Sequence, residues 1–456
     1  MNIGLIGTEQ VEDFWSQNTR RMVFHEYPNG AFTLLAILSL LETEPTDKTR
    51  FGWDEKYYQA QRTQSASANA DGPFTAAGGD VNLTTAGWSA AVDTVIRVKT
   101  VANGTDYFGV NDEVIVRDVP LAAGGVTDVI GLVTSIVDST RLEIALIEAV
   151  SGALNTTAAN ELYISAVGNA NAEFAGIEGR SRFYPPIEPE NLTQIFRKDF
   201  DFSRSVLKQG LKWDKTGIYK EKSKDALIEH MTNIEWSMLF GTKHIRYVQR
   251  RGKQVQQRTM GGVLWFLRQW EKQYSIYRGG NGVDSGPDAI TSDDDDDKRI
   301  ISNPTGVVTP TKLSKWIMNA FRYTFNKQFE KVGVCGSGFL QVLNEMYAGT
   351  TTLTEVQGSL KTYGMDVVQH RTPHGVIWWK THPLFTEDPN LKHSALILET
   401  ATKKYRPLND SDTEVYKFRQ ANDEDGRVDE WLTEAGLENR FPAADLFIKK
   451  ATSWQH

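Results

Sequence analysis

The stretch DALIEHMTNIEWSMLFGTKH, residues 225–244, has the pattern of a long amphipathic helix. Its apolar residues recur at intervals of four, three and four, which places them on one stripe of a helix; they are Leu227, Met231, Ile234 and Met238. The polar residues mostly off this stripe are Glu229, His230, Asn233 and Glu235. The helix is predicted to end at Phe240, with Gly241 as a left-handed cap. We expect a long helix that packs through one apolar stripe and carries no catalytic group.

Length and composition bound the classes of protein that remain. The chain has 456 residues, enough for roughly two to four domains, and 40% of them are hydrophobic. The formal charge of −8 gives no overall basic field of the kind that nucleic-acid-binding proteins use. A single cysteine, Cys335, excludes an intramolecular disulfide framework.

The chain shows no targeting or membrane signal. Its first residues are acidic and polar, so no secretory signal is expected. The longest apolar run, Ala31–Leu41, is about half as long as a membrane-spanning helix needs to be. It therefore predicts a buried or partner-facing helix, and no membrane partner.

Residues 1–56 form a predicted N-terminal arm, and residues 57–175 differ from it in character. In the arm, Phe51 and Trp53 alternate with polar residues, as in a strand with one apolar face. Residues 57–175 are rich in small residues and valine, with a turn at Asp138–Thr140 between two alternating runs. They predict an inserted all-β domain of six to eight short strands.

Beyond the insertion, helix-bearing chain resumes. Residues 176–219 predict an extended loop with a long returning strand, in which Phe196 and Phe200 alternate with polar residues. After the helix, HIRYVQRRGKQVQQRTMGG, residues 244–262, predicts a β-hairpin with a turn at Gly252, and GVLWFLRQWEKQY predicts a short helix.

The C-terminal half predicts a mixed α+β body. A helix is expected to begin at Thr309 as N-cap and Pro310 as first residue, with a buried face that extends to Phe325. A strand, a glycine turn and a helix follow in VGVCGSGFLQVL, then several strands up to the C-terminal ADLFIKKAT; the segment just before that last strand is predicted to be a loop.

Several motifs suggest chemistry, but each has a simpler interpretation. VGVCGSG, residues 332–338, lacks the lysine and Ser/Thr of a phosphate loop, so a tight strand-to-helix turn is favoured. Pro373 separates His370 from His374, and His382 follows. The alternating residues on either side of the proline predict a strand, a turn and a strand, in which the imidazole rings would point apart, so no metal site is expected. Cys335 has no family signature of a nucleophile around it.

Two charged runs also have competing interpretations. The acidic run Asp293–Asp297 lacks the spacing of a calcium loop and predicts a solvated loop. The basic run from Lys243 to Arg258 could touch nucleic acid, but charge on a hairpin also blocks unwanted strand pairing, which is the favoured interpretation in an acidic chain. No cofactor is expected from any of these motifs.

The order of these pieces resembles tailed-bacteriophage major capsid proteins of the Hong Kong 97-type fold, in a subgroup with an inserted β domain. The segments that carry the resemblance, in chain order, are AFTLLAILSLLETEPTDKTRFGWDE, NLTQIF, IEWSMLFG, TMGGVLWFL and GVCGSGFLQVL. The resemblance covers most of the chain outside residues 57–175. It implies that residues 220–330 form a peripheral domain with a spine helix, and that residues 331–456 form an axial domain and the closing strands of the peripheral domain.

This resemblance implies a structural protein rather than an enzyme. Copies of the chain would form pentamers and hexamers of an icosahedral head around double-stranded DNA, in the virion and, during assembly, in the host cytoplasm. Portal, scaffolding and cement proteins are further partners that the family allows, and DNA contact would be non-specific. Aromatic residues of the arm and loop would be buried only on assembly; they are Phe51, Trp53, Phe196 and Phe200. The alternative is a phage tail or capsid-decoration protein with a β binding module.

Overall fold

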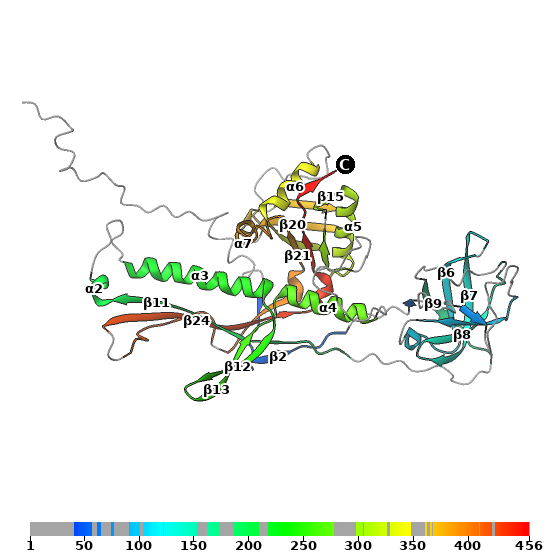
Figure 1. Ribbon diagram of the computed structural model, residues 1–456, viewed down its shortest axis with the longest axis horizontal. Coiled ribbons are helices and arrows are strands. Elements are labelled where there is room, and N and C mark those ends of the chain that lie inside the picture. The colour runs from blue at the N-terminus through cyan, green and yellow to red at the C-terminus, as the bar shows by residue number, and fades with distance from the viewer. Residues whose placement is uncertain are drawn as a thin grey trace, which may run out of the picture. The chain divides into compact units, whose positions relative to one another are not determined.

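The structure is a computed structural model of the 456-residue chain. It describes residues 41–56, 62–64, 74–76, 91–100, 104–121, 123–150, 152, 162–173, 186–208, 218–277, 298–303, 305–325, 329–347, 361–362, 365–366, 368–409, 411–421 and 425–455. The chain divides into two compact units, both drawn in Figure 1. The first comprises Met1–Trp53, Pro189–Arg268 and Ile290–His456, and the second comprises Asp54–Glu188 and Gln269–Ala289.

A five-stranded sheet of the first unit is built on one long strand, β24 (Gly426–Asn439). It pairs antiparallel with all of β11 (Gln194–Ser203) and, near its end, with β22 (Lys403–Pro407). The remaining strands are β1 (Glu42–Thr43), parallel to β22, and β23 (Glu414–Tyr416), antiparallel to β24. The prediction of a loop before the C-terminal strand is wrong, because most of that segment is β24.

The predicted spine helix is α3 (Ile218–Phe240), which runs beside β11 and β24 in Figure 1. It ends at Phe240 as predicted, but Gly241 is not in the left-handed region, so the predicted cap is wrong. Glycine is needed there for space, since an added Cβ would lie 2.3 Å from the carbonyl oxygen of Ser237 and 2.9 Å from that of Met260. The chain turns closely here because the amide of Gly262 donates to the carbonyl of Gly241.

A second, six-stranded sheet forms the other half of the first unit. Its strand order is β14 (Ile300–Ser302), β25 (Leu446–Lys449), β21 (Ala395–Leu398), β16 (Glu330–Cys335), β20 (Gly375–Thr381) and β19 (Val368–Thr372). Strand β16 pairs parallel with β20 and antiparallel with β21. Both faces of the sheet are covered, which explains why a strand such as β21 is an unbroken apolar run.

Three helices belong to this half: α5 (Pro310–Phe321), α6 (Ser337–Tyr347) and α7 (Pro383–Glu387). The predicted start of α5 is confirmed, because the Thr309 hydroxyl accepts a hydrogen bond from the amide of Lys312 and Pro310 occupies the first turn. The prediction that Phe325 lies on its buried face is wrong. The helix stops at Phe321, and Phe325 is exposed and stacked on Phe441 with ring centroids 4.4 Å apart.

The smaller elements of the chain connect these parts. They are β2 (Arg50–Gly52) with β10 (Glu190–Leu192), β12 (His244–Arg250) with β13 (Lys253–Thr259), β15 (Val307–Val308) with β26 (Ser453–Trp454), β17 (Lys361–Thr362) with β18 (Met365–Asp366), α2 (Arg204–Leu207), α4 (Val263–Tyr277), η5 (Thr400–Thr402) and η6 (Pro442–Ala444). The predicted hairpin and the helix after it are confirmed as β12–β13 and α4.

One hydrophobic core joins the C-terminal half of α3 to both sheets. Ile234 and Met238 of the helix share it with Leu437 of the five-stranded sheet and with Val334 and Phe447 of the six-stranded sheet. The opposite face of the six-stranded sheet has a separate core with α5 and α6. The end of α3 therefore fixes the two sheets to each other.

The second unit contains a seven-stranded antiparallel sheet in the order β3-β9-β6-β7-β8-β5-β4. These strands are β3 (Arg62–Gln64), β4 (Phe74–Ala76), β5 (Val95–Lys99), β6 (Asp112–Pro120), β7 (Val126–Asp138), β8 (Arg141–Leu146) and β9 (Tyr163–Asn169), with the short helix η4 (Gly104–Tyr107). Alternate residues such as Val114, Val116 and Ile144 fill its own core. The unit is wider than residues 57–175, since Glu55 and Ile187 pair as a β-bridge at its base.

Two predicted segments lie outside the described residues. They are the apolar helix Ala31–Leu41, except for Leu41 itself, and the acidic run Asp293–Asp297. Within the described chain, no helix has the length and apolar character that crossing a membrane requires.

Candidate assembly surfaces

The aromatic arm strand packs on its own chain. Phe51 in β2 is 6% exposed, and the Arg406 guanidinium lies 5.6 Å from its ring centroid. Trp53 is half-buried, with its ring 5.7 Å from that of Phe266 and 6.3 Å from that of Phe51. The expectation that Phe51 is buried only on assembly is wrong, because distant parts of the sequence supply the missing core. Trp53 keeps one side open to solvent.

Phe196 and Phe200 on β11 are also buried within the single chain. The ring of Phe196 meets His230 of α3 edge-on at 6.5 Å, and that of Phe200 lies 5.9 Å from Tyr219. The prediction that these two residues face a neighbouring subunit is wrong, since α3 covers them. Among the exposed side chains of β11, Ile195 is the large apolar one.

The stripe of α3 is only partly as predicted. Ile234 and Met238 are buried, whereas Leu227 and Met231 are half-buried. His230 and Glu235, expected off the stripe, are buried as well. Helix α3 packs against both the five-stranded and the six-stranded sheet, so the buried part of its surface is wider than one stripe.

Polar pairs accompany this wider contact. The imidazole Nε2 of His230 lies 2.7 Å from the hydroxyl of Thr433 on β24, and burial lowers the pKa of His230. Glu235 lies 3.2 Å from Nε2 of His382, which also caps α7 by accepting a hydrogen bond from the amide of Leu384. Each pair ties α3 to a different part of the first unit.

Asn191 begins the segment NLTQIF, which carried part of the family resemblance, but no contact was predicted for its side chain. It is 0% exposed. Its Nδ2 donates to the carbonyls of Gly261 and Leu437 at 2.9 and 2.6 Å, and its Oδ1 accepts from the amides of Gly261 and Leu192 at 2.8 and 2.9 Å. One amide therefore holds β10, the loop before α4 and strand β24 together.

The neighbouring Glu190 links the arm to the root of the hairpin. Its carboxylate pairs with Arg50 of β2 and with Lys243, whose Nζ lies 2.8 Å away. Hydrogen bonds from Arg50 and then Lys243 lower the pKa of Glu190 to about 2. The carboxylate is thus ionised at neutral pH and pins β2 to β10.

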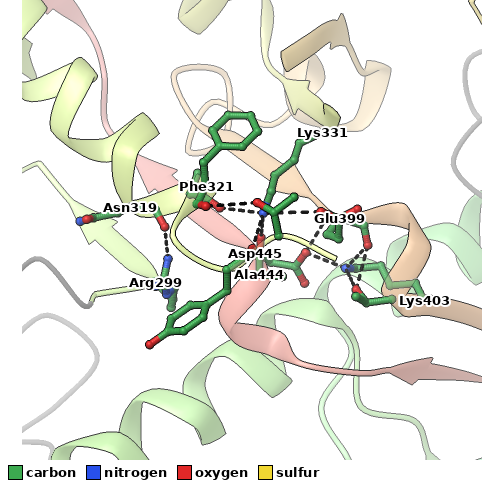
Figure 2. A network of polar contacts seen from close by, with 12 residues as sticks. Arg299, Asn319, Phe321, Lys331, Glu399, Lys403, Ala444 and Asp445 are labelled. Atoms are coloured by element: carbon green, nitrogen blue, oxygen red, sulfur yellow. Dashed lines mark hydrogen bonds and ion pairs between the residues drawn. The ribbon is translucent and has the colours of Figure 1, made fainter. Parts of the chain in front are cut away.

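A buried polar network stabilises the six-stranded half, as Figure 2 shows. Lys331 donates to the carbonyls of Ala320, Tyr323 and Ala444 at 2.6, 3.0 and 2.5 Å, and its Nζ lies 3.8 Å from Glu399. Burial lowers the pKa of Lys331 to about 8 and raises the pKa of Glu399, so each group is biased towards its neutral form.

Two more cations complete this network. Lys403 donates to Asp445 at 2.6 Å and to the carbonyl of Glu399 at 3.0 Å, and Arg299 donates to the carbonyl of Asn319 (Figure 2). Most acceptors are backbone carbonyls at or near the ends of elements. The network therefore holds the end of α5 against the starts of β16 and β25. Sequence reasoning missed it because most of its acceptors are backbone carbonyls rather than side chains.

The residues that suggested chemistry are separated in the structure. Cys335 is buried at the end of β16, and burial raises its pKa to about 12, the reverse of what a nucleophilic thiol needs. His370 is buried on β19, His374 is exposed at the turn before β20, and His382 caps α7. Among the described residues no cluster of three or more His, Cys, Asp or Glu could hold a metal ion.

Comparison with known proteins assigns the family. The model of the SU10 major capsid protein family matches residues 31–452, which is most of the chain. This chain belongs to that family. The resemblance to phage major capsid proteins is confirmed at this level, and the family is one of structural proteins rather than enzymes.

Solved capsid structures are similar at low identity. Matches from Mycobacterium phage Bobi and Mycobacterium phage Cain are each 7% identical and cover 99% of this chain and 100% and 99% of theirs, with TM-scores of 0.41 and 0.42. The capsid of an empty GTA particle is 11% identical, covers 62% of this chain and 81% of its own, and has a TM-score of 0.38. No curated protein matches.

Proposed function

We propose that this chain is the subunit that builds an icosahedral phage head, forming pentamers and hexamers that close around double-stranded DNA. The observation that carries the proposal is the family match over residues 31–452. The hydrophobic core that α3 shares with both sheets also supports the proposal. Ile234 and Met238 hold the helix and the two sheets together, which gives a subunit suited to assembly in many identical copies. The site of action is the virion capsid, with assembly in the host cytoplasm.

In this proposal α3 is the spine of the peripheral domain, and the six-stranded half is the axial domain. The unit Asp54–Glu188 is the inserted β domain, which has its own core of alternate strand residues. Expressed alone, residues 54–188 should give a β-type circular dichroism spectrum and one cooperative melt. A featureless spectrum would show that this sheet depends on the rest of the chain.

The assembly proposal is tested by sedimentation velocity on the purified full-length chain over a range of protein concentration. We expect rings or closed shells above a threshold concentration, because closed assemblies form cooperatively through repeated interfaces. A single monomeric boundary at every concentration, with and without scaffolding protein of the same phage, would contradict the proposal. Portal, scaffolding and cement proteins are the partners that such a shell would recruit, and the DNA inside would be held without sequence-specific contacts.

A further inference from the structure

The β12–β13 hairpin extends from the first unit with both faces open to solvent, as its position in Figure 1 shows. Its large apolar side chains Ile245, Tyr247 and Val255 are 37%, 64% and 48% exposed. The rest of the unit holds only its root, where Arg258 lies 2.9 Å from Glu434. Because a lone two-stranded hairpin is only marginally stable in water, this one has the character of a surface that gains a partner.

The hairpin is also strongly basic. From Lys243 to Thr259 the chain carries six lysine and arginine residues and no acid. Lys243 and Arg258 at the root are ion-paired with Glu190 and Glu434. Among the described residues, no acid is paired with the tip residues, which are Arg250, Arg251 and Lys253.

The tip holds its charges close together. Arg250 and Lys253 are directly opposite in the strand register, an arrangement that repels and weakens the hairpin by itself. Arg251 and Gly252 both have positive φ, 51° and 75°, as in a two-residue turn that matches the twist of the strands. Proteins break such local rules mainly at functional or strained sites, and an acidic partner at this tip would offset the repulsion between Arg250 and Lys253.

The geometry points to this hairpin as an interface element that binds an acidic surface on a second copy of this chain. The inference rests on the proposed function, since it names a partner surface for the assembly. The net charge of the whole chain is −8 and the hairpin contributes +6, so the chain without the hairpin has a net charge of −14. A neighbouring copy therefore offers negative charge to the positively charged hairpin.

A protein surface fits the hairpin better than nucleic acid does. Phosphates would engage the basic side chains but leave Ile245 and Val255 exposed, whereas a protein partner buries both kinds of side chain. Tyrosine and arginine together are also the residues enriched at protein interfaces. Binding of DNA by the tip is therefore an outcome that the experiment must distinguish.

The test compares two triple variants of the full-length chain. Arg250→Glu/Arg251→Glu/Lys253→Glu reverses the tip, and Lys220→Glu/Lys224→Glu/Lys417→Glu makes the same change of charge at exposed positions elsewhere. We expect the tip variant to melt like the wild type and to need at least about tenfold more protein to assemble, while the control assembles normally. Equal assembly of tip variant and wild type overturns the inference and leaves the proposed function intact. Equal loss in both variants also overturns it, because net charge alone would then be responsible.

Two further measurements resolve the remaining outcomes. If the tip variant assembles but no longer shifts the anisotropy of a labelled DNA duplex, the hairpin faces nucleic acid and the inference is wrong. If the tip variant misfolds, a photo-crosslinking residue in place of Tyr247 decides the matter in otherwise unaltered protein. Assembled particles should then give a covalent dimer on a denaturing gel, and assembled particles with no such dimer exclude the contact. A wild-type chain that never assembles contradicts the proposed function and this inference together.

Discussion

Replacing Asn191 by leucine should destabilise the first unit more than any exposed change. The side chain is fully buried and its amide makes four hydrogen bonds, two of them to the backbone of Gly261. Leucine has a similar size but leaves the buried N–H and C=O of Gly261, and the N–H of Leu192, without this partner. At about 1–3 kcal/mol for each buried group left unsatisfied, two or three such groups give roughly 2–9 kcal/mol.

A loss of that size is a large part of the stability of a typical domain, which is about 5–15 kcal/mol. The assay is urea unfolding of the full-length chain below its assembly threshold, followed by tryptophan fluorescence and circular dichroism. The first-unit transition should move to lower urea with an unchanged slope, and the transition of the second unit should not move. Asn233→Leu on the exposed side of α3 is the matched control and should cost under about 0.5 kcal/mol. Equal midpoints for the two variants would refute the assigned role of Asn191.

Three further predictions follow from the same contacts. Ile234→Ala should cost about 2–5 kcal/mol in the same urea assay, because the residue is 1% exposed where the two sheets meet, and a cost below about 1 kcal/mol would contradict that placement. Trp53→Ala should leave a folded monomer, since the side chain is only partly buried, but should lower shell yield and leave free monomers on a sizing column; an unfolded monomer would assign Trp53 to the core of the subunit alone. The pKa of Glu190 is about 2 in the folded chain and 4.5 in an unstructured peptide, so the unfolded chain binds the extra proton and stability should fall as pH drops from about 4.5 towards 2. Glu190→Gln should flatten that part of the pH profile, and an unchanged profile would exclude the carboxylate as its source.

Several elements could be predicted because their signals lie within a few neighbouring residues. The spacing of Ile234 and Met238 indicated α3, Gly252 indicated the hairpin turn, and Thr309 with Pro310 indicated the start of α5. Helical or strand periodicity and capping act directly over such short distances in the sequence.

The longest strand of the first unit, β24, was missed because it carries buried acids, and the strands beside it, β11 and β22, come from other parts of the sequence. In GRVDEWLTEAGLEN, the acids Asp429 and Glu438 are buried, which a strand pattern alone does not allow. They are neutralised by arginines such as Arg427 and Arg440, and Asp429 also accepts a hydrogen bond from Tyr219 on α3. A buried carboxylate is tolerated when a cation or a hydroxyl group pairs with it, but only the folded structure shows that these partners lie next to the acid.

The intrachain partners of the arm aromatic residues were missed for a related reason. Phe51 and Trp53 have no apolar neighbours nearby in the sequence, which suggested another subunit as their partner. The structure instead brings Phe266 and Arg406 to them, from more than two hundred residues away. Local sequence shows that an aromatic residue needs a partner, but it does not show whether the partner belongs to the same chain.

Cryo-electron microscopy of particles formed by the purified full-length chain would show whether this chain builds the shell. We expect closed icosahedral shells with pentamers and hexamers, in which α3 lies beside β11 and β24 in every subunit and the β12–β13 hairpin touches a neighbouring copy. Particles in which this chain sits only as a tail segment or as a decoration on a shell of another protein would contradict it.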